Sequence, residues 1–138
     1  TIGAPIRAAG LQFGWHNHDF EFLALKDGTY PIEAILEAAP SLVLELDLAW
    51  VAVAGGSPVE WIERYKNRII SAHIKDHAPK GENLDEGGWA DVGHGVLDWD
   101  EISTCLRATG IGRFVLEHDN PKDGVRFATR SYEKLITF

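Results

Sequence analysis

The chain contains, at positions 14–22, the stretch Gly14-Trp15-His16-Asn17-His18-Asp19-Phe20-Glu21-Phe22, on which the prediction of its fold rests. An apolar run that begins at Leu11 leads into this stretch, where two histidines, one amide and two carboxylates stand close together. Because such a cluster is costly in a core, the pattern predicts a strand that ends at an active site. An apolar run followed by ionisable residues recurs downstream in 42–47, 69–76 and 114–119. Four strands that each end in ionisable residues are therefore expected.

Length and composition predict one soluble globular domain over 1–138, since 138 residues with 45% hydrophobic and 25% charged side chains can bury a core. No run approaches the roughly 18 apolar residues of a membrane span, so no membrane is expected as a partner. The single cysteine, Cys105, allows no internal disulfide and favours a reducing, cytoplasmic setting. The formal net charge of -8 disfavours binding to nucleic acid.

Turn and capping signals divide the chain into alternating helices and strands. Strands are predicted at 11–18, 42–47, 69–75 and 113–118. Helices are predicted at 31–39, 58–67, 97–109 and 123–135, after the end of another helix at 1–10. Ser57 and Pro58 are expected to begin the second of these helices as its N-cap and first residue. The segment 77–95, with five glycines, is predicted to form a folded lid.

The alternation of strands and helices predicts a parallel sheet in an α/β fold. No glycine-rich phosphate motif opens a helix, whereas every predicted strand ends in polar residues, as in a (β/α) barrel. A full TIM (β/α)8 barrel has eight strands and about 250 residues, so four strands predict a parallel (βα)4 half-barrel. An open sheet of this kind leaves unpaired backbone N–H and C=O groups on its two edge strands, which can pair with another chain. We therefore expect another copy, in a homo-oligomer, or a missing N-terminal half to complete it.

Side-chain alternation predicts which residues share one face of the sheet. These are Val43, Glu45 and Asp47, then Ser71, His73 and Lys75, then Val115, Glu117 and Asp119. One imidazole among several carboxylates is a mixed ligand set that suits Mn²⁺, Mg²⁺, Co²⁺ or Zn²⁺. A divalent metal cofactor is therefore expected.

The same residues also have structural interpretations. Asp47 would cap the turn that follows its strand, and His73 would be a hydrogen-bonded core histidine. Glu45 would form an ion pair inside the barrel with Lys75 or Arg113.

Five motifs, spread from Leu11 to Asp119, carry a resemblance to a known family. They are His16-Asn17-His18-Asp19-Phe20-Glu21-Phe22, Glu45-Leu46-Asp47, Ala72-His73-Ile74-Lys75-Asp76, Val92-Gly93-His94-Gly95-Val96-Leu97-Asp98-Trp99 and Val115-Leu116-Glu117-His118-Asp119. The sequence resembles the C-terminal half of the sugar phosphate isomerase/epimerase family, the xylose isomerase-like barrels. The resemblance implies a small-molecule sugar or sugar phosphate as the substrate.

Matched by position, the resemblance implies a metal ion held by Glu21, Asp47, His73 and Glu117. Glu21 and Glu117 would remove and return the substrate proton, and Lys75 would stabilise the developing oxyanion. The residues expected to bind substrate are His16, His18, Trp50, His94 and His118. Three of these depart from residues common in the family, because His118 replaces Gln, His94 replaces Glu and Trp50 replaces His. The substrate is therefore left open.

The implied reaction is metal-assisted proton transfer through an enediolate, which makes the chain an isomerase or epimerase. A dehydratase-type lyase acting on an inosose or keto-sugar would begin with the same proton abstraction and then lose water. A phosphodiesterase acting on DNA is disfavoured by the negative charge. An inactive half-barrel that serves as an assembly module is the non-enzymatic alternative.

Overall fold

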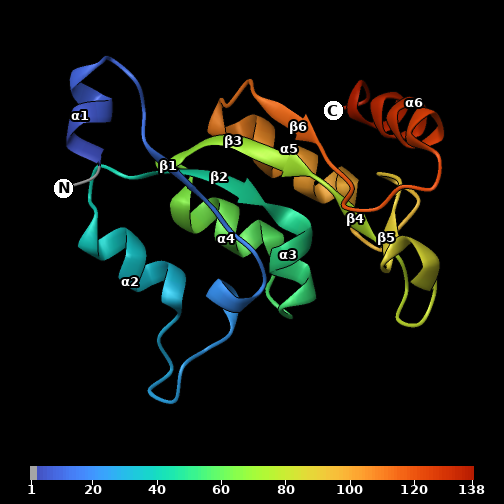
Figure 1. The fold of residues 1–138 in the computed structure, drawn as a ribbon, viewed down its shortest axis with the longest axis horizontal. Coiled ribbons are helices and arrows are strands. Elements are labelled where there is room, and N and C mark those ends of the chain that lie inside the picture. Colours follow the sequence, from blue (N-terminus) through green and yellow to red (C-terminus); the bar gives the residue numbers. More distant parts are fainter. Residues whose placement is uncertain (1–2) are drawn as a thin grey trace.

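The computed structural model describes residues 3–138, which form a four-stranded sheet with helices around it (Figure 1). The helices are α1 (Gly3–Ala8), α2 (Pro31–Ala38), α3 (Leu48–Val53), α4 (Pro58–Tyr65), α5 (Trp99–Thr109) and α6 (Gly124–Leu135), with 3-10 turns η1 (Phe20–Phe22) and η2 (Leu84–Glu86). The sheet strands are β1 (Gly14–His16), β2 (Val43–Asp47), β3 (Ile69–Ile74) and β6 (Phe114–Leu116), and a hairpin pairs β4 (Asp76–His77) with β5 (Trp89–Ala90). Thr1 and Ile2, where the helix predicted at 1–10 begins, lie outside the described residues.

The four sheet strands are all parallel and lie in the order β1-β2-β3-β6, which confirms the predicted parallel α/β sheet. One face of the sheet belongs to the core. Buried members of that core from β2, β3, α4 and α5 include Leu44, Leu46, Ala72, Ile74, Trp61, Ile62, Ile102 and Leu106. Side chains alternate along a strand, so Glu45 and His73 point to the opposite face, where both are half-buried. This second face carries the polar chemistry.

The helices follow the predicted capping signals with one addition. Ser57 accepts a hydrogen bond from the Glu60 amide at the start of α4, and Asp98 caps α5 in the same way. Helix α3 was not among the predicted helices. It begins directly after β2 because the Asp47 carboxylate accepts a hydrogen bond from the Trp50 amide at 2.9 Å. None of the helices in residues 3–138 combines the length and apolar character needed to cross a membrane.

The predicted lid is a folded structure that one buried carboxylate, Asp76, holds in place. Asp76 accepts hydrogen bonds from the amides of Gly93, Gly95 and Leu97 and from the indole Nε1 of Trp99 at 2.8 Å. A Cβ atom on Gly95 would lie 2.2 Å from Oδ1 of Asp76, so glycine is required there. The β4–β5 hairpin and the following loop are thereby fixed to the end of β3.

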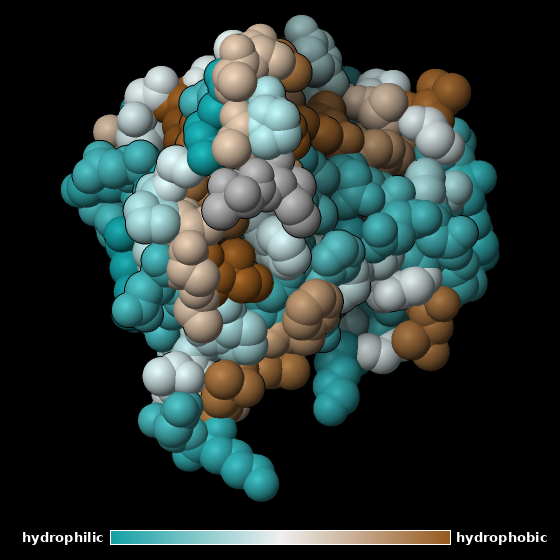
Figure 2. All heavy atoms as spheres, turned by 60° about the vertical axis from the view of Figure 1, so that its left-hand side comes forward, coloured by the Kyte–Doolittle hydropathy of each residue, from teal (hydrophilic) through white to brown (hydrophobic). Residues whose placement is uncertain are grey.

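Several apolar side chains are exposed in the segments next to the two outer strands in sequence. Leu11 precedes β1, whereas Phe20, Leu23 and Leu25 follow it, and Val125, Tyr132 and Ile136 lie on or just after α6, which follows β6. Figure 2 looks toward the α1 and α2 end of the molecule and shows apolar surface between hydrophilic regions. Within the described residues β1 pairs only with β2, and β6 pairs only with β3. Within the described residues the sheet thus has two open edges, as expected for half of a barrel.

Candidate functional site

Asp47, His73 and Glu117 come together where three neighbouring strands end. Asp47 pairs in register with His73 across β2 and β3, and Glu117 directly follows β6. Nδ1 of His73 lies 3.5 Å from Oδ2 of Asp47 and 3.8 Å from Oε2 of Glu117. One ligand atom from each residue lies within 4.8 Å of the other two. We call these three residues the candidate metal group.

The candidate metal group fits a divalent cation. Asp47 is fully buried, and its Oδ1 atom is used by the helix cap on the Trp50 amide. Its Oδ2 atom and Nδ1 of His73 are both buried, and neither has a hydrogen-bond partner among the described residues. An unsatisfied buried polar atom costs about 1–3 kcal/mol, and a cation between these two atoms would satisfy both. One nitrogen and two carboxylate oxygens form a donor set suited to Zn²⁺, Mn²⁺, Co²⁺ or Mg²⁺.

The two structural interpretations of these residues therefore have different outcomes. Asp47 does cap the following helix, as that interpretation predicted, but with one oxygen only. The second oxygen of Asp47 faces His73. His73 is only half satisfied as a core histidine, because its Nε2 contacts Glu45 whereas its Nδ1 has no hydrogen-bond partner among the described residues. Capping and metal binding are thus compatible in Asp47.

Charges within the candidate metal group shift the ionisation of its members strongly. Burial lowers the pKa of His73, but the nearby carboxylates of Asp47 and Glu117, followed by that of Glu45, favour the protonated ring and raise the pKa to about 10. The contact with His73, and then Lys75, lower the pKa of Glu117 to about 2 despite its burial. Without a cation, a protonated imidazole therefore offsets part of the negative charge of the carboxylates. A cation that binds here must displace that proton.

Lys75 supplies a buried positive charge beside the candidate metal group. Its Nζ atom lies 2.8 Å from Oε2 of Glu117 and 2.5 Å from Oδ2 of Asp119. The same ammonium group lies 3.8 Å from the ring centre of Trp89 and 4.8 Å from that of Trp50. Two carboxylates and two aromatic faces thus compensate the burial of this charge. The predicted catalytic residue Lys75 is within contact of the predicted catalytic residue Glu117.

Glu45 has different partners from those predicted. The expected ion pair with Lys75 or Arg113 is wrong, because Glu45 accepts a hydrogen bond from Ser71 at 2.7 Å and lies 3.1 Å from Nε2 of His73. Lys75 is instead drawn to the carboxylates that follow β6. Glu45 lies opposite Ser71 in the register between β2 and β3. This register could not be predicted from the sequence alone.

The structure does not bring Glu21 to the other three predicted metal ligands. Glu21 is buried in turn η1, where Oε1 accepts a hydrogen bond from the Trp15 indole at 2.9 Å and Oε2 accepts one from the His18 amide at 2.8 Å. Both carboxylate oxygens thus hold the segment after β1 in shape. Among the described residues, Glu21 belongs to no group of metal-ligating side chains.

Asn17 is a residue of the site that sequence reasoning did not single out. It is fully buried, its Oδ1 atom accepts a hydrogen bond from the Asp47 amide at 2.9 Å, and its Nδ2 group donates to the Asp47 carbonyl at 3.1 Å. This paired contact extends the bonding between β1 and β2 to the point where Asp47 leaves the sheet. Its position among the polar residues after β1 was the available signal.

His16, His18 and Trp50 form a row beside the candidate metal group. The His16 ring lies 4.3 Å from the His73 ring and 5.2 Å from the His18 ring, centre to centre. The exposed His18 ring lies 5.4 Å from Trp50. Burial, and then the charge of His73, lower the pKa of His16, which keeps it neutral at physiological pH. These three predicted substrate contacts therefore lie at one edge of the site.

His94 and His118 lie apart from that row. His94 is exposed on the loop after β5, where it lines a cavity with Arg126 and Arg130. His118 is buried, its Nδ1 accepts a hydrogen bond from the Asn120 amide at 3.2 Å, and its ring meets Phe127 edge-on. Their role in substrate binding stays a prediction.

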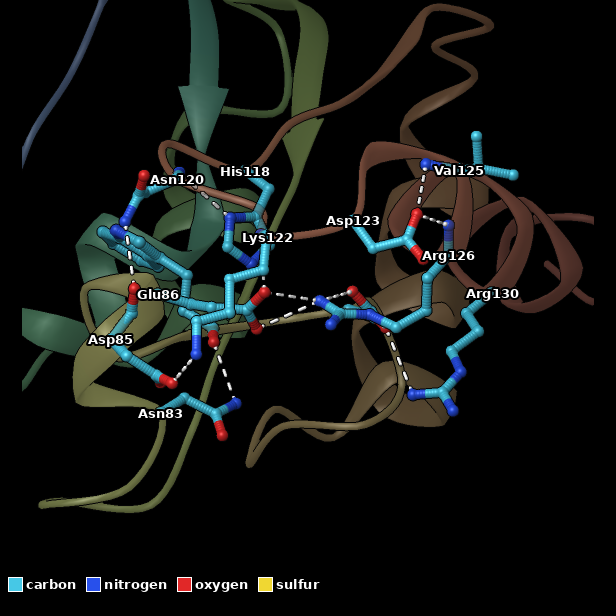
Figure 3. Close-up of polar contacts among 12 residues, drawn as sticks. Asn83, Asp85, Glu86, His118, Asn120, Lys122, Asp123, Val125, Arg126 and Arg130 are labelled. Atoms are coloured by element: carbon cyan, nitrogen blue, oxygen red, sulfur yellow. Dashed lines mark hydrogen bonds and ion pairs between the residues drawn. The ribbon is translucent and has the colours of Figure 1, made fainter.

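A network of charged residues ties the lid to α6 (Figure 3). Arg126 of α6 donates to both oxygens of Glu86, at 2.9 and 3.0 Å, and to Asp91 at 2.9 Å. Arg130 reaches Asp91 at 3.3 Å, and the Lys122 amide donates to Glu86 at 2.7 Å. Because Glu86 and Asp91 are buried, these contacts are stronger than exposed ion pairs. The lid is therefore anchored on two sides, by Asp76 and by α6.

Comparison by sequence finds no matching protein family and no matching curated protein. Comparison of structures does find relatives in fold. A sugar phosphate isomerase/epimerase from Parabacteroides distasonis ATCC 8503 is 27% identical with a TM-score of 0.76, and the match covers 96% of this chain and 47% of that protein. The probable 3-DHS dehydratase AsbF of Bacillus anthracis, involved in petrobactin synthesis, is 17% identical with a TM-score of 0.73, over 99% of this chain and 52% of that one.

A more distant match is the IOLI protein with a binding zinc atom, 15% identical with a TM-score of 0.53, over 99% of this chain and 66% of that one. The chain spans about half the length of the first two solved structures. It therefore has the fold of one half of a xylose isomerase-like TIM barrel, as predicted, and it resembles isomerase/epimerase-like enzymes in structure.

Proposed function

We propose that this chain is the catalytic C-terminal half of a divalent-metal-dependent sugar isomerase or epimerase, completed by a second copy or by an N-terminal half. The observation that carries the proposal is the pair of buried, unpartnered atoms, Oδ2 of Asp47 and Nδ1 of His73, that face Glu117 at the end of the sheet. In barrels of this type the strand ends at this side carry the chemistry.

Asp47, His73 and Glu117 would hold the metal ion, which supplies polarisation of a substrate carbonyl when it is bound. Glu117 would be the base that accepts the proton of a C–H group that the bound cation acidifies. Lys75, 2.8 Å away, supplies the positive charge that stabilises the oxyanion formed as the proton leaves. Both groups reach the site from adjacent strand ends.

Aromatic side chains beside Lys75 suit a small sugar. A cavity of about 290 Å³ is lined in part by Trp50, Trp89, His77 and Lys80. Its size is at the lower end of ligand sites, and its aromatic walls suit the C–H faces of a polyol while Lys80 suits its oxygens. Lys75 and the candidate metal group lie behind Trp50 and Trp89 and do not line this cavity. The exposed His18 lies next to Trp50 and would contact the hydroxyl groups of a sugar there.

A metal-binding experiment tests this proposal. We expect the purified protein to bind Zn²⁺ or Mn²⁺ with one ion per chain, measured by calorimetric titration. His73→Ala and Glu117→Gln are expected to weaken binding by more than tenfold, whereas Glu60→Gln, a change at an exposed glutamate of α4, serves as the control. If both site variants bind the metal as tightly as the parent, the assignment of the site is wrong.

A dehydratase-type lyase is the second candidate, and the position of Lys75 favours it. Loss of water requires an acid that protonates the departing hydroxyl, and Lys75 carries protons within 2.8 Å of the proposed base, Glu117. Product analysis by NMR separates the two reactions, because an epimerase keeps the mass of its substrate and a dehydratase forms a double bond. Formation of an unsaturated product would replace the isomerase proposal with the lyase.

A further inference from the structure

We propose that Glu45, held by Ser71, is the positioning residue that presents Nδ1 of His73 to the cation in the candidate metal group. The inference rests on the proposed function insofar as it needs that cation. It assigns a role to Glu45 and Ser71, which lie outside the candidate metal group on the face of the sheet opposite the core. Its physical basis is the difference between the two ring nitrogens of one histidine.

The two nitrogens of His73 face different surroundings. Nδ1 faces Oδ2 of Asp47 and Oε2 of Glu117, at 3.5 and 3.8 Å, distances too long for good hydrogen bonds. Nε2 lies 3.1 Å from Oε1 of Glu45, within hydrogen-bonding distance. Glu45 accepts only, so the proton on His73 belongs on Nε2 whenever the ring carries one proton. The lone pair of Nδ1 is then free for a cation.

Ser71 fixes the carboxylate that makes this choice. The Ser71 hydroxyl is buried and donates a hydrogen bond of 2.7 Å to Oε2 of Glu45, which leaves Oε1 to face His73. Glu45 is therefore a carboxylate with both oxygens engaged, and its position is defined from two sides.

The sheet itself builds this arrangement. Glu45 lies in register with Ser71, and two residues further along the same strands Asp47 lies in register with His73. This register places Ser71 against Glu45 and brings His73 between Glu45 and Asp47. The His16 ring packs 4.3 Å from the His73 ring and restricts its rotation. A carboxylate behind a metal-binding histidine raises the basicity of the ring, and removing it weakens metal binding by about 10–100-fold.

A competing arrangement uses the same residues differently. His16, Glu45 and His73 also place one ligand atom each within 4.8 Å of one another, and Nδ1 of His16 is buried without a partner. A second cation in that group would replace the proton between Glu45 and Nε2 of His73. The number of ions bound per chain separates the two arrangements.

The test uses Zn²⁺ as the probe and three variants: Glu45→Ala, Glu45→Gln and Ser71→Ala, with Glu60→Gln as the exposed control. We expect one Zn²⁺ per parent chain, and a dissociation constant raised about 10–100-fold in Glu45→Ala. Glu45→Gln keeps an acceptor for Nε2–H, so its dissociation constant for Zn²⁺ is expected to lie between those of the parent and Glu45→Ala. Ser71→Ala is expected to weaken binding in the parent but not further in Glu45→Ala, since both act through one carboxylate.

The second measurement is the ¹⁵N NMR spectrum of the zinc-loaded protein, which reports which nitrogen of His73 carries the proton. We expect zinc on Nδ1 and the proton on Nε2 in the parent, and a mixture of Nδ1-bound and Nε2-bound rings in Glu45→Ala. Thermal unfolding of each metal-free variant shows whether a loss of affinity reflects loss of fold. A merely structural role for Glu45 would lower stability without changing the ring state.

Three results would overturn the inference. Unchanged affinity and ring state in a folded Glu45→Ala protein would remove the role of Glu45 and leave the proposed function intact. Two ions per parent chain, one of them lost in Glu45→Ala, would make Glu45 a ligand instead. Absence of zinc binding by the parent would overturn the metal site of the proposed function and this inference together.

Discussion

Replacement of Asp76 with alanine is expected to destabilise the protein more than any single change of an exposed charge. The carboxylate is fully buried and accepts hydrogen bonds from four backbone amides and one indole. Three of those amides, in Gly93, Gly95 and Leu97, belong to the segment between β5 and α5. Alanine would leave all of these donors without their acceptor.

The size of the effect follows from these contacts. A hydrogen bond to a charged group contributes about 1.5–3 kcal/mol when it is removed alone. Bonds that share one acceptor are not additive, because the loop relaxes and water replaces part of the loss. We therefore expect the free energy of unfolding to fall by about 3–5 kcal/mol, a large share of the 5–15 kcal/mol typical of a domain. For a chain of this size that corresponds to a drop in Tm of about 10–20 °C.

Urea denaturation followed by circular dichroism measures this difference, with Asp98→Ala as the matched control. Asp98 is also an aspartate of this loop, but it accepts a single amide hydrogen bond, from Glu101 at 3.1 Å, so its loss is expected to cost about 1 kcal/mol. If Asp76→Ala is no less stable than Asp98→Ala, the reasoning from shared hydrogen bonds is refuted.

Three further changes test other parts of the site. Because the pKa of His73 is raised to about 10, protons compete with the cation for His73 below that pH. Zn²⁺ affinity, measured by chelator competition, is therefore expected to rise by up to tenfold per pH unit between about pH 6 and 8. A flat profile would show that His73 is already neutral. Lys75→Met keeps the length of the side chain and removes its charge, so the pKa of Glu117 is expected to rise, as ¹³C NMR titration of the carboxylate would show. The open edges at β1 and β6 predict self-association, and a stable monomer at micromolar concentration in light scattering would speak against completion of the barrel by a second copy.

The alternation of side chains along strands was enough to predict which residues would share a face. It placed Asp47 and His73 together because parallel strands align their ends, and the structure has these two residues in register. This alternation could not guide the placement of Glu21, since the chain leaves β1 at His16 and continues into the 3-10 turn η1, where the period of two is lost. Predictions of side-chain direction therefore failed to reach beyond the ends of the strands.

Partners in the site were harder to predict than positions. The expected ion pair between Glu45 and Lys75 was wrong. Glu45 bonds instead to Ser71 on the neighbouring strand, and Lys75 pairs with Glu117, which follows β6. The role of Asn17 depends on the backbone of Asp47 becoming free where β2 turns into α3. Such contacts require the register between strands and the path of the chain after them, and neither is encoded in the local pattern of polar and apolar residues.

The lid and the candidate metal group are coupled through a short series of contacts. Asp76 anchors the β4–β5 hairpin, the hairpin supplies Trp89, and the Trp89 ring covers the ammonium group of Lys75 at 3.8 Å. Lys75 in turn pairs with Glu117 at 2.8 Å. Loss of the lid would expose Lys75 to water, weaken its attraction to Glu117 and so raise the pKa of that carboxylate. Asp76→Ala is therefore expected to change the ionisation of Glu117 as well as the stability of the fold, although the Asp76 carboxylate bonds to other groups than Lys75 and Glu117.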